Sequence, residues 1–115
     1  MENITINGHI WFQTASGLRI GEGRAKLLEE IENSGSISEA ARKLEIPYRR
    51  AWGMIKDMNT NAKESLVIKE VGGKDGGRSI LTKEGKRIVA LFKKINKCFK
   101  EFSEDESSRI SGGEK

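Results

Sequence analysis

The sequence contains very little of several residue types on which many enzymes and extracellular proteins depend. Cys98 is the only cysteine, so no internal disulfide can form, and a reducing compartment is the simplest expectation. Neither Cys98 nor His9, the only histidine, has the closely spaced Cys or His companions of a metal site. No pair of nucleophile and base is apparent either. The sequence therefore predicts no metal ion, no cofactor and no enzymatic activity.

Long apolar runs are also missing. No stretch approaches the ~20 consecutive apolar residues that cross a bilayer, and the N-terminus lacks the apolar segment of a signal peptide. We therefore expect a soluble, cytoplasmic protein without a membrane partner.

Lysine and arginine, by contrast, are abundant and unevenly distributed. The net charge is +4 and the isoelectric point is about 9.3. Residues 69–100 contain ten Lys or Arg and three Asp or Glu, whereas residues 101–115 contain five acids and two bases. A basic middle followed by an acidic end suggests a polyanionic partner for the basic part, although charge alone fits a solvated, lysine-rich surface equally well.

The length of 115 residues, of which 36% are apolar, fits one small domain with a modest core. β-forming residues before and after a turn at residues 15–17 predict an N-terminal β-hairpin. Helical spacing of apolar residues then predicts a helix that begins near Glu22 and stops at Gly35.

Two further helices follow with almost no chain between them. Ser36 or Ser38 can cap the second helix, and Glu39 would complete a capping box with Ser36. Pro47 suits only the first turn of the third helix. The buried stripe of this third helix is predicted to contain Ala51, Ile55 and Met58.

Two strands over residues 67–71 and 79–81 are predicted next, joined by a glycine-rich loop, and Thr82 can cap a long last helix. Residues 104–115 turn polar and are expected to form a disordered tail, so the predicted domain covers residues 1–103. The fold class is predicted to be α/β, mainly α. Its architecture is a winged helix-turn-helix with an N-terminal β-hairpin and a long C-terminal helix.

In a helix-turn-helix, the second helix lies in the major groove of DNA, and a hairpin that follows can contact the neighbouring backbone as a wing. The N-terminus of that helix, and the side opposite its buried stripe, should face double-stranded DNA. The residues predicted to contact DNA are Ser36, Ser38, Tyr48, Arg49, Arg50, Gly53, Lys56, Lys74 and Arg78.

The last helix carries more apolar residues than one side of a small core needs. Pairing with a second copy would bury the excess, and two-fold symmetry is the commonest arrangement. The residues expected at this homodimer interface are Trp11, Ile88, Leu91, Phe92, Ile95, Phe99 and Phe102. A dimer would bind an inverted-repeat operator.

The runs "GSISEAARKLEIPYRRAWGMIKDMN" and "GGKDGGRSILTKEG" resemble the DNA-binding half of the molybdate-responsive transcriptional regulators, the ModE family. The resemblance covers roughly residues 18–95. It implies a homodimeric winged helix-turn-helix that binds operator DNA, often as a repressor, through the third helix and the wing. Genes related to molybdenum or tungsten are implied as targets by the resemblance alone.

Two departures from the family pattern matter. Pro47 stands where the family has a serine, so the side-chain cap of the third helix is lost. The family's molybdate-binding domains have no counterpart in these residues, so oxyanion sensing is not expected of them.

Three features of the sequence admit other interpretations. The string "GGKDGGRS" nearly fits a P-loop, but Arg78 replaces the lysine and a strand is predicted where a helix should follow. Trp52 can contact DNA or belong to the core or its rim, which we favour, and Tyr48 is expected to be exposed. The alternative function is a protein–protein interaction module, which would not need a continuous positive face on the third helix and wing.

Overall fold

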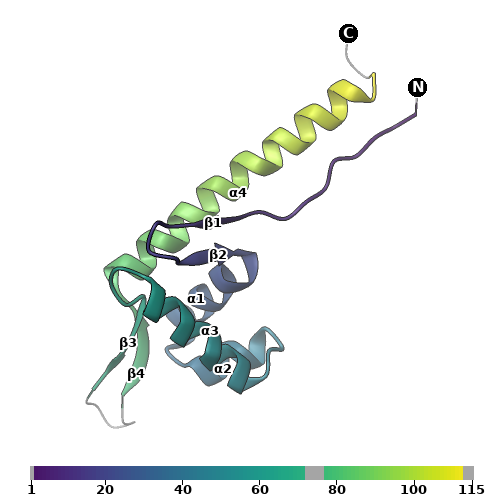
Figure 1. Cartoon of the computed structure of the whole chain (residues 1–115). Coiled ribbons are helices and arrows are strands. Elements are labelled where there is room, and N and C mark those ends of the chain that lie inside the picture. The colour runs from purple at the N-terminus through teal and green to yellow at the C-terminus, as the bar shows by residue number, and fades with distance from the viewer. Residues whose placement is uncertain (1, 72–76, 113–115) are drawn as a thin grey trace.

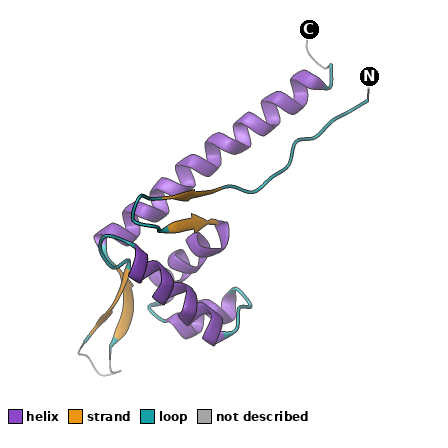
Figure 2. Ribbon diagram, viewed as in Figure 1, coloured by secondary structure: helices purple, strands orange, loops and turns teal. Residues whose placement is uncertain are grey.

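The computed structural model describes residues 2–71 and 77–112 (Figure 1). In these ranges the helices and strands follow the order β-β-α-α-α-β-β-α, which confirms the mainly helical α/β class and the winged-helix architecture (Figure 2). The elements are β1 (Trp11–Gln13), β2 (Arg19–Gly21), α1 (Glu22–Ser34), α2 (Ile37–Lys43), α3 (Tyr48–Asn61), β3 (Val67–Glu70), β4 (Arg78–Leu81) and α4 (Lys83–Ile110). β1 pairs with β2 and β3 with β4, each antiparallel.

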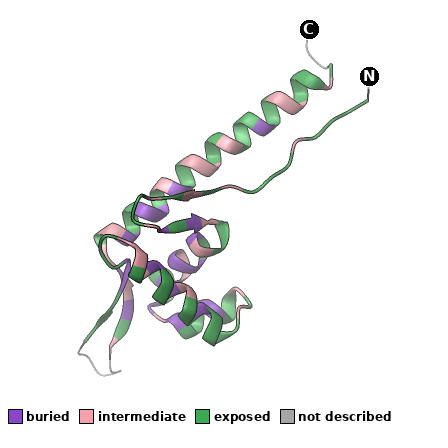
Figure 3. Ribbon diagram, in the orientation of Figure 1, coloured by how far each residue is buried: buried purple, intermediate pink, exposed green. Residues whose placement is uncertain are grey.

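One apolar core joins α1, α2 and α3 to the base of both hairpins and to the first part of α4 (Figure 3). Leu28 and Ile31 of α1 and Met58 of α3 are fully buried in it. Burial of each such side chain contributes roughly 1.5–3 kcal/mol. The helix-turn-helix is therefore anchored on the core by one side, and its other side faces solvent.

The sharp bend between α2 and α3 is a Schellman turn at Glu45. The Ile46 N–H donates to the Ala41 carbonyl at 2.9 Å, and the Glu45 N–H donates to the Arg42 carbonyl at 3.1 Å. Glu45 has a φ of 58°, the left-handed conformation that glycine most often takes in this position. Main-chain bonds thus determine the bend, at the expense of strain in one non-glycine residue.

Helix ends lie where the sequence predicted them at three places. Gly35 ends α1 with a φ of 75°. The Ser36 hydroxyl accepts from the Glu39 N–H at 3.0 Å, but the Glu39 carboxylate pairs with Arg42 instead of completing a capping box. Thr82 caps the start of α4 through its hydroxyl.

α4 is longer than the sequence predicted. It ends at Ile110 rather than near Ser103, so residues 104–110 are helical where a disordered tail was expected. The end of the last helix therefore does not coincide with the predicted domain boundary. In the described ranges, neither α4 nor another helix is long and apolar enough to span a membrane.

The N-terminal segment runs beside the outer part of α4. The N–H groups of Ile4 and Ile6 donate to the hydroxyls of Ser111 and Ser107, each at 2.8 Å. Because this segment and the outer part of α4 extend beyond the core, the chain is elongated. Its radius of gyration is 17.7 Å, against about 13 Å for a compact domain of this length. The projecting structure, called the arm below, consists of residues 2–9 and 99–111 (Figure 1).

We expect Glu45→Gly to increase the free energy of unfolding by about 0.5–1 kcal/mol, because glycine adopts the left-handed conformation without a Cβ penalty. The gain is partial because glycine also loses more backbone entropy on folding. Thermal denaturation followed by circular dichroism measures it. Glu45→Val is the matched opposite change and should lower the melting temperature. A lower melting temperature for Glu45→Gly would mean that the glutamate side chain contributes more than the strain costs.

Candidate nucleic-acid interface

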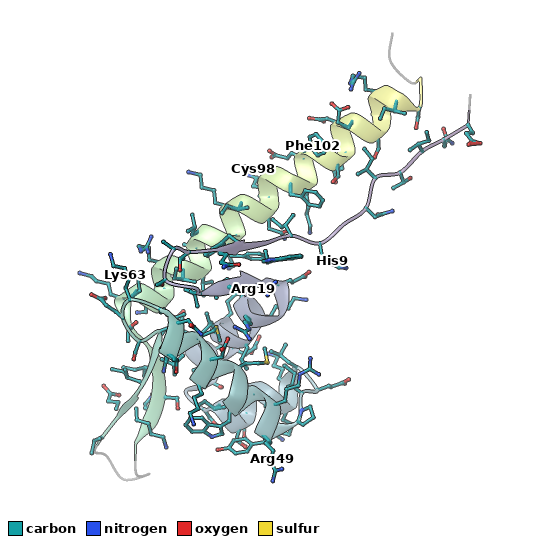
Figure 4. All side chains as sticks on the ribbon, in the orientation of Figure 1. His9, Arg19, Arg49, Lys63, Cys98 and Phe102 are labelled. Atoms are coloured by element: carbon teal, nitrogen blue, oxygen red, sulfur yellow. The ribbon has the colours of Figure 1, made fainter. Side chains whose placement is uncertain are left out.

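α3 has one buried side and one exposed side. Ala51, Ile55 and Met58 form the predicted buried stripe. Arg49 and Lys56 are exposed. Figure 4 shows Arg49 at the start of α3, directed away from the rest of the chain. α3 therefore presents cationic side chains outward while its other side holds it on the core.

Neighbouring acids do not neutralise these cations. Among the residues that the structure describes, Arg49, Arg50 and Lys56 take part in no ion pair. Arg24 of α1, by contrast, is paired with Asp57 of α3 at 2.7 Å. Exposed cations without acidic partners produce a positive electrostatic potential that attracts an anionic ligand. The positive end of the α3 dipole adds to this potential.

Two aromatic side chains lie beside these cations. The Trp52 Nε1–H donates to the Tyr48 hydroxyl at 2.5 Å, and both side chains are exposed. Trp52 is 40% exposed and is not among the described residues that pack against the core, so its favoured placement in the core or at its rim is wrong. The next residue, Gly53, has no atom within 4 Å of the position that a Cβ would occupy. The backbone of α3 is therefore open to close approach from outside at this point.

The turn that precedes α3 leaves the helix without a side-chain cap. Pro47 occupies the N-cap position and forms no side-chain hydrogen bond there, which confirms the predicted loss of a cap. The first N–H groups of α3 are thus left to solvent or to an anion. On α2, Ser38 is exposed, whereas the half-buried Ser36 uses its hydroxyl to cap its own helix.

The wing is a short hairpin attached to the helix-turn-helix. In the β3–β4 pairing Glu70 lies opposite Arg78, which is exposed. Lys74, the other predicted DNA contact in the wing, lies outside the described residues. The Ser79 N–H donates to the Gly35 carbonyl at 3.0 Å, so β4 is joined to the corner between α1 and α2.

Asn59 is a positioning residue that sequence reasoning did not identify. Its Oδ1 accepts from the N–H groups of Leu66 at 2.8 Å and Val67 at 3.3 Å. Its Nδ2 donates to the Val67 carbonyl at 2.9 Å. These bonds set the direction in which the wing leaves α3. The available signal was an amide side chain near the end of a predicted helix that a strand follows closely.

The apolar seam of α4 divides into two stripes. Ile88 and Phe92 are buried in the chain's own core, which corrects their assignment to a dimer interface. The other stripe, called the outer stripe below, is half-buried or exposed. It consists of Leu91, Ile95, Cys98 and Phe102.

The remaining residues expected at a dimer interface have separate surroundings. Phe99 is half-buried, and its ring lies 3.2 Å from the position of a Cβ on Gly8. Trp11 is exposed, and the Arg19 guanidinium lies 5.3 Å from the centre of its ring.

In the described part of the chain, no group of three or more His, Cys, Asp or Glu side chains could hold a metal ion.

A short turn between two helices, a cationic second helix and a two-stranded hairpin after it together define the winged helix-turn-helix class.

No protein-family model matches the chain. Curated relatives do match it. The chain is 42% identical over 82 residues to the "Molybdenum transport protein ModE" of Azotobacter vinelandii, which covers 71% of this chain and 30% of that protein.

Two further relatives carry the same name. The "Transcriptional regulator ModE" of Yersinia pestis is 45% identical over 69 residues, covering 60% of this chain and 26% of that protein. The "DNA-binding transcriptional dual regulator ModE" of Escherichia coli K12 is 38% identical over 88 residues, covering 73% and 34%. The resemblance to the ModE regulators is thereby confirmed, and the chain spans about a third of the length of these relatives.

We expect Asn59→Ala to lower the free energy of unfolding by about 1–3 kcal/mol, because the N–H groups of Leu66 and Val67 lose their acceptor in a partly buried site. Urea denaturation measures the change. Asn61→Ala is the control, since the Asn61 amide donates only within α3, to Asp57, and its loss should matter less. Equal losses in the two variants would contradict the linking role of Asn59.

Proposed function

We propose that this chain is a cytoplasmic, sequence-specific DNA-binding transcriptional regulator. The observation that carries the proposal is the exposed side of α3, where Arg49, Arg50 and Lys56 have no acidic partner among the described residues and Gly53 leaves the backbone open. A helix anchored by one side, with free cations on the other, suits the major groove. Similarity to ModE proteins that are named as transcriptional regulators supports the same function.

Each cationic or aromatic side chain of the interface is proposed to contact either a base or a phosphate, according to its position. Arg49 lies on the groove side and is assigned to base edges, where an arginine can bind guanine through two hydrogen bonds. Arg50 lies next to the buried stripe and is assigned to a phosphate, as is Tyr48. Arg78, on the wing, is assigned to the DNA backbone beside the groove. Phosphate contacts would set the register of the protein, and base contacts its sequence preference.

We also propose that the regulator is a homodimer paired through the outer stripe of α4. The stripe residues follow one another at intervals of four, three and four, the spacing of a two-stranded seam. Phe102 is 55% exposed in the single chain, and burial of each large apolar side chain contributes roughly 1.5–3 kcal/mol. The operator should then be an inverted repeat whose half-site centres lie about one turn of DNA apart, or a multiple of that.

A binding selection from random duplexes with the purified chain tests the function. Enrichment of an inverted repeat is expected. Genes of molybdenum transport are the first targets to examine in the search for natural operators, because a relative's name refers to that process. Failure to enrich any sequence would contradict the proposal and favour the alternative, a winged-helix protein-interaction module.

We expect Arg49→Ala to weaken binding to the selected operator by about 1–3 kcal/mol and to relax its sequence preference, because a base contact is lost. Arg50→Ala should instead weaken binding to all sequences alike. Fluorescence anisotropy titrations measure both. Arg87→Ala is the control, since Arg87 is an exposed cation on α4 that pairs with Glu84. Unchanged affinity and preference in Arg49→Ala would show that another side of α3 faces DNA.

We expect Phe102→Glu and Leu91→Glu to shift the chain from dimer to monomer, because each places a charge in the apolar seam. Sedimentation equilibrium at micromolar concentration measures the assembly. Ala90→Glu, an equally sharp change from apolar to charged at an exposed position outside the stripe, should leave the dimer intact. A native chain that is monomeric, or two stripe variants that remain dimeric, would contradict pairing through α4.

A further inference from the structure

The Arg78 guanidinium packs against Gly35 across the junction of wing and helices. A Cβ built on Gly35 would lie 2.9 Å from Nη2 and 3.1 Å from both Cζ and Nε of Arg78. Because these three atoms are almost equally distant, the planar group lies face-on over the Gly35 Cα. The two main chains are joined beside it by the bond from the Ser79 N–H to the Gly35 carbonyl.

This packing uses the face of the guanidinium, whereas its N–H donors lie in the plane of the group. Arg78 is exposed, and in the ranges that the structure describes it forms no ion pair. Glu70 lies directly opposite it in the wing, a position from which opposite charges usually interact. Arg78 instead turns to Gly35, so no acidic residue in the described ranges neutralises its charge, which is left to a ligand.

Gly35 therefore meets two separate requirements. Its φ of 75° favours glycine and, next to glycine, asparagine. The space over its Cα is occupied by Arg78, and asparagine there would displace the guanidinium, because a Cβ at 2.9 Å is closer than a normal contact. The end of α1 needs only the first requirement. The second concerns the placement of Arg78.

We propose that Gly35 is a positioning residue for Arg78: it is the platform that holds the guanidinium at a set place beside α3, where it meets one DNA phosphate. The inference rests on the proposed DNA-binding function and adds a residue that itself touches no DNA. Arginine suits the role because its planar fork stacks by its face and binds phosphate oxygens by its edge. Without the platform, a long exposed side chain loses rotamer entropy when it binds.

The test uses Gly35→Asn, Arg78→Gln and the double variant of the full chain. Gly35→Asn keeps a residue that tolerates the left-handed conformation, so its melting temperature should stay near that of the native chain. Binding to a mixed-sequence duplex is measured at several salt concentrations. Separately, NMR records the Nε–Hε resonance of Arg78 in the free protein, which is assigned by its loss in Arg78→Gln.

We expect Gly35→Asn to lower affinity about three- to tenfold, the effect of one exposed charged hydrogen bond, and to reduce the slope of log K against log salt by about 0.9. In the Arg78→Gln background, Gly35→Asn should have no further effect. Equal effects in both backgrounds, or an unchanged slope, would overturn the proposal.

The two proposals can fail separately. If the native chain binds no duplex, the DNA-binding function fails, and the Nε–Hε resonance decides the positioning: it should move and sharpen in Gly35→Asn, and an unchanged resonance overturns the platform. If Gly35→Asn does not fold, Arg78→Lys replaces it, because lysine keeps the charge but lacks the flat group. Arg78→Lys should then lose nearly as much affinity as Arg78→Gln, and native affinity would overturn the platform.

Discussion

The relative placement of α3, the wing and α4 depends on the backbone of Leu66, a fully buried residue between α3 and β3. Its N–H donates to the Asn59 side chain at 2.8 Å, and its carbonyl accepts from the Thr82 N–H at 2.9 Å. Gly85 of α4 packs so close that a Cβ there would lie 2.4 Å from the same carbonyl oxygen. A larger residue at position 85 would push α4 away from the wing. Three elements thus meet at the main chain of Leu66, through contacts that allow little displacement.

This junction explains why the candidate interface can be rigid although the wing is short. The wing is held at one strand by Asn59 and Leu66, and at the other by the bond between Ser79 and Gly35. α3 is held by its buried stripe. The cationic side chains on these elements are therefore displayed at set distances before any ligand arrives. Preorganisation of this kind reduces the entropy that binding would otherwise lose.

The helix-turn-helix and the wing could be predicted from sequence because their signals are local. Ala51, Ile55 and Met58 recur at helical spacing, and capping residues stand at the helix ends. The end of α4 could not be predicted, since it is supported by a bond from Ile6 to Ser107, which are 101 positions apart. Periodicity likewise identified the apolar side of α4, but not which of its two stripes the core would cover. That choice depends on how α4 crosses α1, which no local pattern records.

The length of α4 also makes this helix a lever. Its 28 residues extend over about 42 Å at 1.5 Å per residue. A rotation of about 5° at one end of such a lever moves the other end by roughly 3.7 Å, close to the rise of one base pair. In an assembly paired through the outer stripe of α4, a small change in the crossing angle of two helices would thus change the separation of the two α3 helices by a whole base-pair step. Side chains far from DNA would then help to decide which operator spacing the protein accepts.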